Sequence, residues 1–399
     1  MRATRLAVIA FALTLTINSV QALAQAITQL CNPAITANYM VASPAQRLAA
    51  GQKAQPPVTD NNNYFAWPDT PSSVIKTATG YEFFASDGGN HARQMWQGHW
   101  VGNNKWGSVV TTTGSLDNPL GAGAPHDVSI SPNPDPSVNP NYWTYTYMGG
   151  GPVYQVPPGM VGAGNLLVVY HGELPNDALY AVLGLAASSD NGLHWTDLGE
   201  IIRLNQAYAP GLDGFEIGDG PLVLSPDGKY FSIHFPDWIA NGTPHTTTTT
   251  NVSAARALVS AVLNAAFAST PAHTVPFEKF YSGNWHIQPG LGGASTDLVP
   301  KSPYQGYIDI HFNGDLQRYV MIISNDTNFA YAESVDGMTW TAPVSLGVFG
   351  PIAAYPTAVG FGSDPQILGK SFFIYYTHLP IDGTGWVNGS MHRLTLTCQ

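Results

Sequence analysis

The chain is poor in charged residues and in cysteine, and it has no long apolar run beyond its first residues. Only 10% of its 399 residues are Asp, Glu, Lys or Arg, and the formal net charge is −11. Nucleic-acid-binding proteins need clustered basic side chains, so this composition argues against that class. No later stretch reaches the roughly 20 apolar residues of a membrane-spanning helix. We therefore expect neither a nucleic-acid partner nor a membrane span.

The first residues have the pattern of an export signal. Arg2 and Arg5 precede an apolar run over residues 6–17, and Ala22-Leu23-Ala24 has the small-x-small form of a cleavage site. We expect a signal peptide at residues 1–24, an N-terminal arm at 25–63 and the main domain at 64–399. The mature protein is expected to be secreted or periplasmic, and monomeric.

The two cysteines, Cys31 and Cys398, lie near the two ends of the mature chain. In an oxidising compartment, such a pair is expected to form a disulfide bond. This bond requires Cα atoms about 4–7 Å apart, so the ends of the chain must meet. A closed ring of repeated units has that geometry.

Glycine, proline and aromatic residues are abundant, with 41 Gly, 31 Pro, 19 Tyr and 10 Trp. Residues 187–196 and 333–341 repeat one unit, in which an apolar strand leads into a polar turn containing Asp and Gly. Trp195 and Trp340 close these two turns, and Trp143 is expected in the core. A repeated hairpin predicts a repeated sheet, and a β-propeller is the first architecture to test.

Other segments also have strand patterns bounded by turns. They are residues 81–85, 142–147, 166–171, 221–224, 230–235, 319–324 and 371–378. Residues 251–268 instead have apolar side chains at helical spacing, which predicts one helix inserted in a blade. Five blades would contain on the order of 75 residues each, and a division into six or seven stays open.

Four aspartates lie at the start of expected strands rather than inside turns: Asp69, Asp127, Asp219 and Asp309. In a propeller, the innermost strands begin at the mouth of the central channel, so these carboxylates are expected to converge. Hydrolysis of a glycosidic bond needs one protonated carboxyl group and one ionised carboxylate. A third carboxylate raises the pKa of the acid, because like charges resist joint ionisation.

Three expected blade heads carry Asp69, Asp127 and Asp219-Gly220-Pro221, in this order. Through these residues, the segment 67–378 resembles the five-bladed β-propeller glycoside hydrolases. These include the arabinanases and β-xylosidases of family 43 and their invertase-like relatives. The resemblance implies a general base at Asp69, a pKa-modulating aspartate at Asp127 and a general acid on the third blade. The family has Glu before Gly-Pro, whereas this chain has Asp219 there and Glu216 upstream, so both are candidate acids.

Aromatic and polar residues near the expected channel are candidates for sugar binding, because sugar C–H faces stack on aromatic rings. The candidates are Trp67, Trp96, Trp238, His126, Asp309 and His311, and His234 is a further residue that could line the channel. Asp309 and His311 share one strand face and are the candidate metal ligands. The resemblance allows a structural calcium ion in the channel, and the chemistry itself requires no cofactor.

The sequence thus predicts an all-β, five-bladed propeller with one inserted helix that hydrolyses a glycosidic bond of an oligo- or polysaccharide. The resemblance suggests an arabinofuranoside-containing substrate. Linkage, anomeric outcome and exo or endo action stay open.

Three alternatives stay open at this point. A lectin-like propeller would repeat its binding site in every blade, whereas the candidate residues differ between blades. Residues 188–195 match the Asp-box of sialidases except at His194, but no arginine stands at an expected strand head. A polysaccharide lyase would need basic residues, and the chain has 15 Lys and Arg in total.

Overall fold

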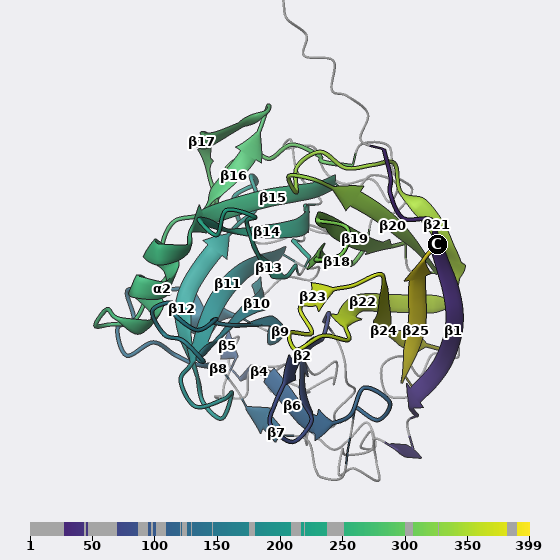
Figure 1. The fold of residues 1–399 in the computed structure, drawn as a ribbon. Helices are drawn as coiled ribbons and strands as arrows, with labels where there is room; N and C mark the ends of the chain where they lie inside the picture. Colours follow the sequence, from purple (N-terminus) through teal and green to yellow (C-terminus); the bar gives the residue numbers. More distant parts are fainter. Residues whose placement is uncertain are drawn as a thin grey trace, which may run out of the picture.

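Five β-sheets stand around a central axis like the blades of a propeller (Figure 1). The computed structural model describes residues 28–43, 45–46, 70–86, 95–96, 99–100, 109–119, 121, 126–128, 130–145, 147–174, 180–208, 217–218, 220–237, 251–299, 306–325, 327–380 and 389–399. The prediction of an all-β, five-bladed propeller with one inserted helix is confirmed.

The blades follow one another along the chain, and the innermost strand of each blade is named first. The first contains β2 (Ser73–Lys76), β3 (Tyr81–Ser86), β6 (Val109–Gly114) and β7 (His126–Val128). The second contains β9 (Tyr147–Gln155), β10 (Leu166–Leu174), β11 (Tyr180–Ser188), β12 (Trp195–Ile202) and β8 (Ile130–Ser131). The third contains β13 (Leu222–Leu224), β14 (Tyr230–Asp237), β15 (Asn251–Leu258), β16 (Glu278–Tyr281) and β17 (Asn284–Pro289).

The last two blades complete the ring. The fourth contains β18 (Ile308–Asn313), β19 (Arg318–Ser324), β20 (Asn328–Ser334) and β21 (Val344–Val348), with β23 (Ile367–Leu368) paired to β18 on the side of the axis. The fifth contains β22 (Ile352–Gly360), β24 (Ser371–Leu379), β25 (Ser390–Cys398) and β1 (Pro33–Ala42). A separate two-stranded sheet joins β4 (Met95–Trp96) and β5 (His99–Trp100).

The apolar core lies between neighbouring blades. Phe84, Tyr170 and Phe231 come from the first three blades, are fully buried and belong to one cluster. Phe329 and Tyr376, from the fourth and fifth blades, pack edge to face in another. Because both faces of a blade are covered, its strands are almost continuously apolar, and this packing fixes the blades around the axis.

The two repeated turns of the sequence have the same hydrogen bonds. Ser188 donates to Asp190 and accepts from the amide of Gly192, at 2.8 and 2.9 Å. Ser334 makes the corresponding bonds with Asp336 and Gly337, at 3.0 and 2.8 Å. The interpretation of these segments as copies of one hairpin is therefore correct.

The inserted helix is shorter than the sequence predicts. Helix α2 (Val259–Phe267) covers the second half of the expected segment, whereas its first half forms β15. Eight residues of β15 pair with β14, and their Ser and Ala side chains fit between two blades. Strand pairing here overrides the helical preference of alanine. Among the described residues, no helix has the length and apolarity needed to cross a membrane.

The expected strand at residues 142–147 begins instead with a 3-10 helix, η1 (Tyr142–Thr144). Trp143 is 61% exposed, so the expectation that it lies in the core is wrong. The turn holds Tyr142 and Tyr145 inward, where their hydroxyls donate to the carbonyl of Ile130 at 2.5 Å and to Glu200 at 2.6 Å. Trp143 lies between these two residues and faces outward.

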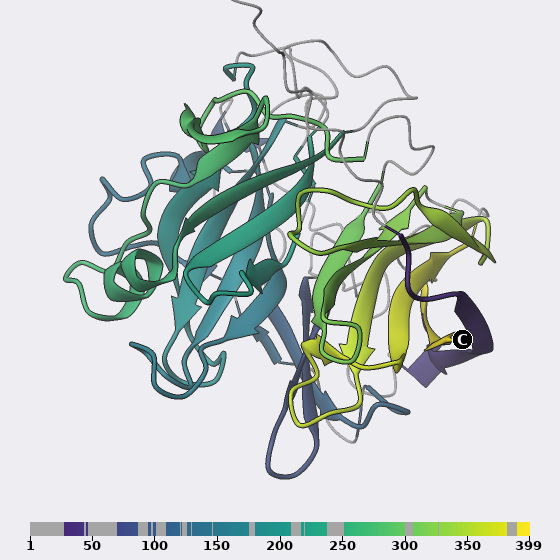
Figure 2. The ribbon, with the colours of Figure 1, turned by 45° about the horizontal axis from the view of Figure 1, so that its top comes forward.

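The ring is closed by strands from opposite ends of the chain. Figures 1 and 2 show β1 (purple) beside β25 (yellow), and the two strands pair antiparallel. Cys31 and Cys398 form the predicted disulfide bond, with Cα atoms 4.9 Å apart. Residues 33–42, which the sequence assigns to an arm outside the propeller, are therefore the outermost strand of its fifth blade.

A buried carboxylate fixes the segment before β1. Glu333, on β20 of the fourth blade, accepts the amide N–H groups of Leu30 and Cys31, both at 2.8 Å. Its side chain is also bonded by the hydroxyl of Tyr331 at 2.9 Å and lies 3.8 Å from Arg318. Hydrogen bonds to an ionised acceptor are about twice as strong as neutral ones, so Glu333 holds Cys31 in place for the disulfide.

His234 joins the third and fourth blades. It lies on β14, is 1% exposed, and its Nε2 donates to the carbonyl of Gly337 at 2.7 Å. The expectation that it lines the channel is wrong, because β14 is the second strand of its blade. Burial lowers the pKa of His234 to about 4, against weaker opposing effects of Gly337 and Asp336. The imidazole is therefore neutral in the folded protein.

This neutral histidine predicts a loss of stability in mild acid. Between about pH 6.5 and 4, the unfolded chain takes up a proton at His234 that the folded chain does not, so stability falls by about 3 kcal/mol as the pH drops. Urea unfolding at several pH values should show this loss. In His234→Gln, which keeps a donor for Gly337, the loss should shrink to the part caused by His392, whose pKa is also lowered to about 4. An unchanged pH profile in this variant would contradict the assignment.

Candidate functional site

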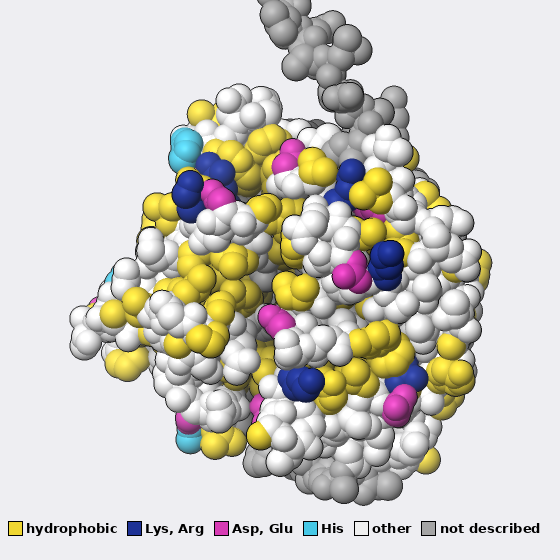
Figure 3. Space-filling model, in the orientation of Figure 1, with side chains coloured by type: hydrophobic (Ala, Val, Ile, Leu, Met, Phe, Trp, Pro, Cys, Tyr) yellow, Lys and Arg dark blue, Asp and Glu magenta, His cyan; other side chains and the backbone are white. Residues whose placement is uncertain are grey.

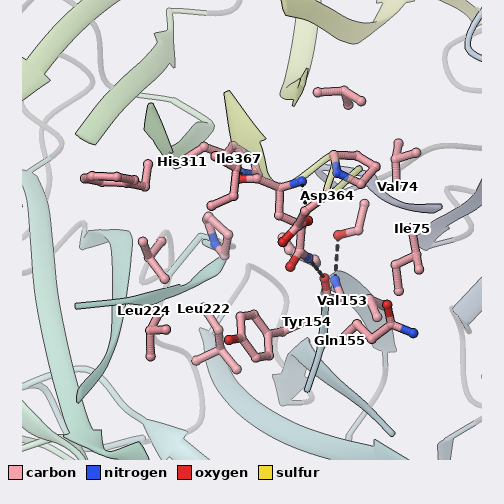
Figure 4. Close-up of a pocket in the computed structure, with 18 of the residues that line it drawn as sticks. Val74, Ile75, Val153, Tyr154, Gln155, Leu222, Leu224, His311, Asp364 and Ile367 are labelled. Atoms are coloured by element: carbon pink, nitrogen blue, oxygen red, sulfur yellow. Dashed lines mark hydrogen bonds between the residues drawn. The ribbon is translucent and has the colours of Figure 1, made fainter. Parts of the chain in front are cut away.

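The innermost strands of the five blades surround an axial cavity of about 840 Å³. Side chains from β2, β9, β13, β18 and β22 line it, and Figure 4 shows them around one central space. Most are apolar, such as Ile75, Val153 and Leu222, and polar side chains such as those of Asp309 and His311 lie among them. A pocket of this size that is lined mainly by apolar side chains, with polar groups among them, is the usual form of a small-molecule site.

The cavity fills the half of the channel in which the innermost strands end. Turn residues after three of these strands reach it: Pro157 after β9, Ser225 after β13 and Asp364 after β22. Figure 3 shows this face of the molecule, hollowed near the axis among apolar side chains. The exposed carboxylate of Asp364 accepts the amide of Gln366 at 2.9 Å. Burial and then the charge of Asp364 raise the pKa of Tyr154 to about 12.

Asp309 and His311 meet in the middle of the channel. Asp309 is 1% exposed, and its Oδ2 lies 2.9 Å from Nε2 of His311 and accepts the amide of Ala358 at 2.5 Å. The other ring nitrogen, Nδ1, donates to the carbonyl of Gln366 at 2.9 Å. Gln366 also donates through its side chain to the carbonyl of Val153 at 2.8 Å (Figure 4), so this residue spans the axis from the fourth blade to the second.

The partners of His311 favour its charged form. Both ring nitrogens face acceptors, a carbonyl and a carboxylate, and an imidazolium can donate to both. Burial of the ring opposes protonation, but the charge and hydrogen bond of Asp309 outweigh it, so the pKa of His311 is raised. The channel thus contains a hydrogen-bonded pair of Asp309 and His311 at its centre, in which Asp309 is buried.

This pair does not fit a calcium ion. Calcium takes six to eight oxygen ligands. Here both nitrogens of His311 and one oxygen of Asp309 already have hydrogen-bond partners. Within the part of the chain that the structure describes, no group of three or more His, Cys, Asp or Glu side chains could hold a metal. We therefore derive no step through an ion at the predicted ligands, Asp309 and His311.

Most of the other predicted site residues are not among the described ones. Asp69, Glu216, Asp219, Trp67 and Trp238 lie outside the described residues. Of the predicted set, the structure brings together Asp309 and His311, which share one face of β18 as expected.

Asp127 does not begin an innermost strand. His126 and Asp127 belong to β7, the outer edge strand of the first blade, and Trp96 belongs to the separate strand β4. Neighbouring strands are about 4.8 Å apart, so β7 runs roughly 14 Å from β2. The second blade instead begins at β9. The premise that Asp127 heads the second blade is therefore wrong.

Sequence reasoning missed two features of the channel. Gln366 and Asp364 belong to the short segment before β23, which pairs with β18 rather than continuing its own blade. Tyr307 precedes β18, and its ring lies 3.9 Å from that of Tyr355 on β22. Tyr307, two residues before Asp309, was the one local signal, whereas its contact with Tyr355 is seen only in the folded structure.

No family model matches the chain, and no curated protein is similar to it by sequence. Solved structures that superpose on it include the α-L-arabinofuranosidase of Podospora anserina, with 9% identity, a TM-score of 0.48, and 87% of this chain and 95% of that chain covered. The GH62 α-L-arabinofuranosidase of Coprinopsis cinerea has 10% identity and a TM-score of 0.47, at 87% and 95% coverage. A family 117 glycoside hydrolase of Zobellia galactanivorans has 11% identity and a TM-score of 0.47, with 87% of this chain and 88% of that chain covered. At such identities, no activity is transferred to this chain.

Proposed function

We propose that the protein is an exported glycoside hydrolase that cleaves a glycosidic bond at the end of its axial channel where the innermost strands begin. The observation that carries the proposal is the axial cavity, lined by the innermost strand of every blade, in a chain whose blade-head sequences resemble five-bladed glycosidases. A lectin-like propeller would repeat one site in each blade, whereas the polar groups of this channel differ from blade to blade. Residues 1–24 would direct export, and residues 25–399 would be the active protein.

In this proposal, carboxylates at the starts of two innermost strands carry the chemistry. Asp69, next to β2, is the general base that activates water or attacks the sugar, and Glu216 or Asp219, before β13, protonates the leaving oxygen. Asp309 would accept a sugar hydroxyl through its second carboxylate oxygen, while His311 holds the first one in place. The resemblance makes an arabinofuranoside-containing polysaccharide the first substrate to test.

The test is release of reducing sugar by purified residues 25–399 from a panel of arabinan, arabinoxylan, xylan, galactan and laminarin. We expect release from at least one polysaccharide, with sugar products that carry a new reducing end. A uronate polysaccharide such as polygalacturonan is added to the panel, and products from it with an unsaturated uronate ring, which absorb ultraviolet light, would instead identify a lyase. Binding to a polysaccharide without release would contradict the proposal and favour a lectin.

A further inference from the structure

Tyr355 has a backbone conformation that side-chain-bearing residues rarely adopt. Its φ is 54°, in the left-handed region, and it lies on β22, an innermost strand. The pairing of β22 with β24 shifts between Ala354 and Thr357, so Tyr355 and Pro356 form an irregularity in the ladder. Such conformations cost free energy, persist only where the surroundings enforce them, and cluster at functional sites.

The irregularity directs groups of β22 toward both neighbouring blades. After it, Thr357 accepts the amide of Ser72 at 2.7 Å, and Ala358 donates to Asp309 at 2.5 Å. The ring of Tyr355, 8% exposed, packs against the ring of Tyr307 with centroids 3.9 Å apart and planes at 46°. The strained residue therefore fixes Tyr307 at the junction of the fourth and fifth blades.

Tyr307 lies at the end of the channel where the innermost strands begin. It directly precedes β18, and its carbonyl accepts the amide of Ser324 at 3.0 Å. Its side chain is partly exposed, unlike that of Tyr355. This end is opposite to the turn that contains Asp364, and it is the end at which β2 begins.

We propose that the ring of Tyr307 is a platform on which one sugar residue of the substrate stacks, and that Tyr355 is its positioning residue. This inference rests on the proposed function. The C–H face of a furanose or pyranose packs on an aromatic ring, and a ring that is already immobilised loses little conformational entropy on binding. The strain at Tyr355 thus serves to present Tyr307 in one orientation.

The test uses full-length mature protein and a linear oligosaccharide from the polysaccharide that the parent degrades, with arabinohexaose as the first probe. Tyr307→Ala should raise KM about tenfold with kcat within about twofold, because stacking is lost and the reacting groups stay in place. Tyr355→Ala should change KM in the same direction. Tyr307→Phe and Tyr355→Phe should behave like the parent, because the ring face alone makes the contact.

Phe361→Ala is the matched control. Phe361 also packs on a ring, that of Phe373 with centroids 4.5 Å apart, and is 45% exposed, but it directly follows β22, at the end of the channel where the innermost strands finish. It should keep the KM of the parent. Tyr355→Ala removes a buried ring and should unfold at a lower temperature than the parent, so all variants are assayed well below that temperature. An unchanged KM in Tyr307→Ala while the parent cleaves the probe would overturn the inference and leave the function intact. A parent that neither binds nor cleaves any polysaccharide of the panel would overturn both.

Discussion

Replacement of Asp69 by Asn is expected to lower kcat about 10³-fold, the usual contribution of a positioned base, which corresponds to about 4 kcal/mol of barrier. KM should change little, because asparagine keeps the size and hydrogen-bonding capacity of the side chain while it cannot accept the proton or attack the sugar. The measurement is steady-state release of reducing sugar from the polysaccharide that the parent degrades best. Circular dichroism and the unfolding temperature show whether the variant is folded.

The matched control is Asp127→Asn. The sequence assigns both aspartates to blade heads, but Asp127 lies on an edge strand of its blade. We therefore expect Asp127→Asn to keep the rate of the parent. Equal losses in both variants would restore Asp127 to the site, and full activity of Asp69→Asn would exclude it as the base.

The same assay separates the two candidate acids. If residues 216–219 alternate like those of a regular strand, Glu216 and Asp219 face opposite sides, and only one of them serves a given substrate. Glu216→Gln or Asp219→Asn, but not both, should lose activity toward ordinary polysaccharides. The variant that lacks the true acid should keep much of its rate on a substrate with an activated leaving group, such as a nitrophenyl glycoside, because such a group leaves without protonation. A loss that is the same on both substrates would contradict the assignment as acid.

The second large effect is expected at the disulfide bond. The double variant Cys31→Ser, Cys398→Ser should unfold at a lower urea concentration, with a loss of about 4 kcal/mol, because a cross-link over a very long loop restricts the unfolded chain. The two cysteines are separated by 367 residues, so nearly the whole described ring lies inside this loop. Tryptophan fluorescence gives the unfolding curve.

A reducing agent provides the control for this variant. Dithiothreitol should lower the stability of the parent to that of the double variant, and it should leave the variant unchanged. The paired strands β1 and β25 and the hydrogen bonds from Leu30 and Cys31 to Glu333 remain in the reduced protein. We therefore expect the reduced protein to be folded below its new midpoint. A variant as stable as the parent would show that these contacts alone close the ring.

Features that depend on local spacing or on composition were predicted correctly. Asp309 and His311 are two residues apart on a strand and so share a face, and two cysteines in one chain leave one intramolecular pairing. The turns at Ser188 and Ser334 follow from the properties of Asp and Gly. In each case, the physical cause lies within a few residues of sequence or in a simple count.

The errors come from features that distant parts of the chain decide. A local pattern locates a strand but does not say whether the strand is innermost or outermost, and Asp127 was misplaced for that reason. Residues 251–258 have a helical pattern, yet pairing with β14 makes them a strand. The contact of Tyr307 with Tyr355 depends on an irregularity in β22 and on the angle between two blades, neither of which leaves a signal in the sequence.

The pairing of β1 with β25 in the fifth blade sets an order of assembly during biosynthesis. β1 is made before the other described strands and its partner β25 after them, so the sheet edge of β1 must wait while the other blades form. Glu333 belongs to the fourth blade and already binds the amides of Leu30 and Cys31. Docking of the N-terminal segment there can precede the arrival of β25 and hold a strand that would otherwise offer its edge to another chain.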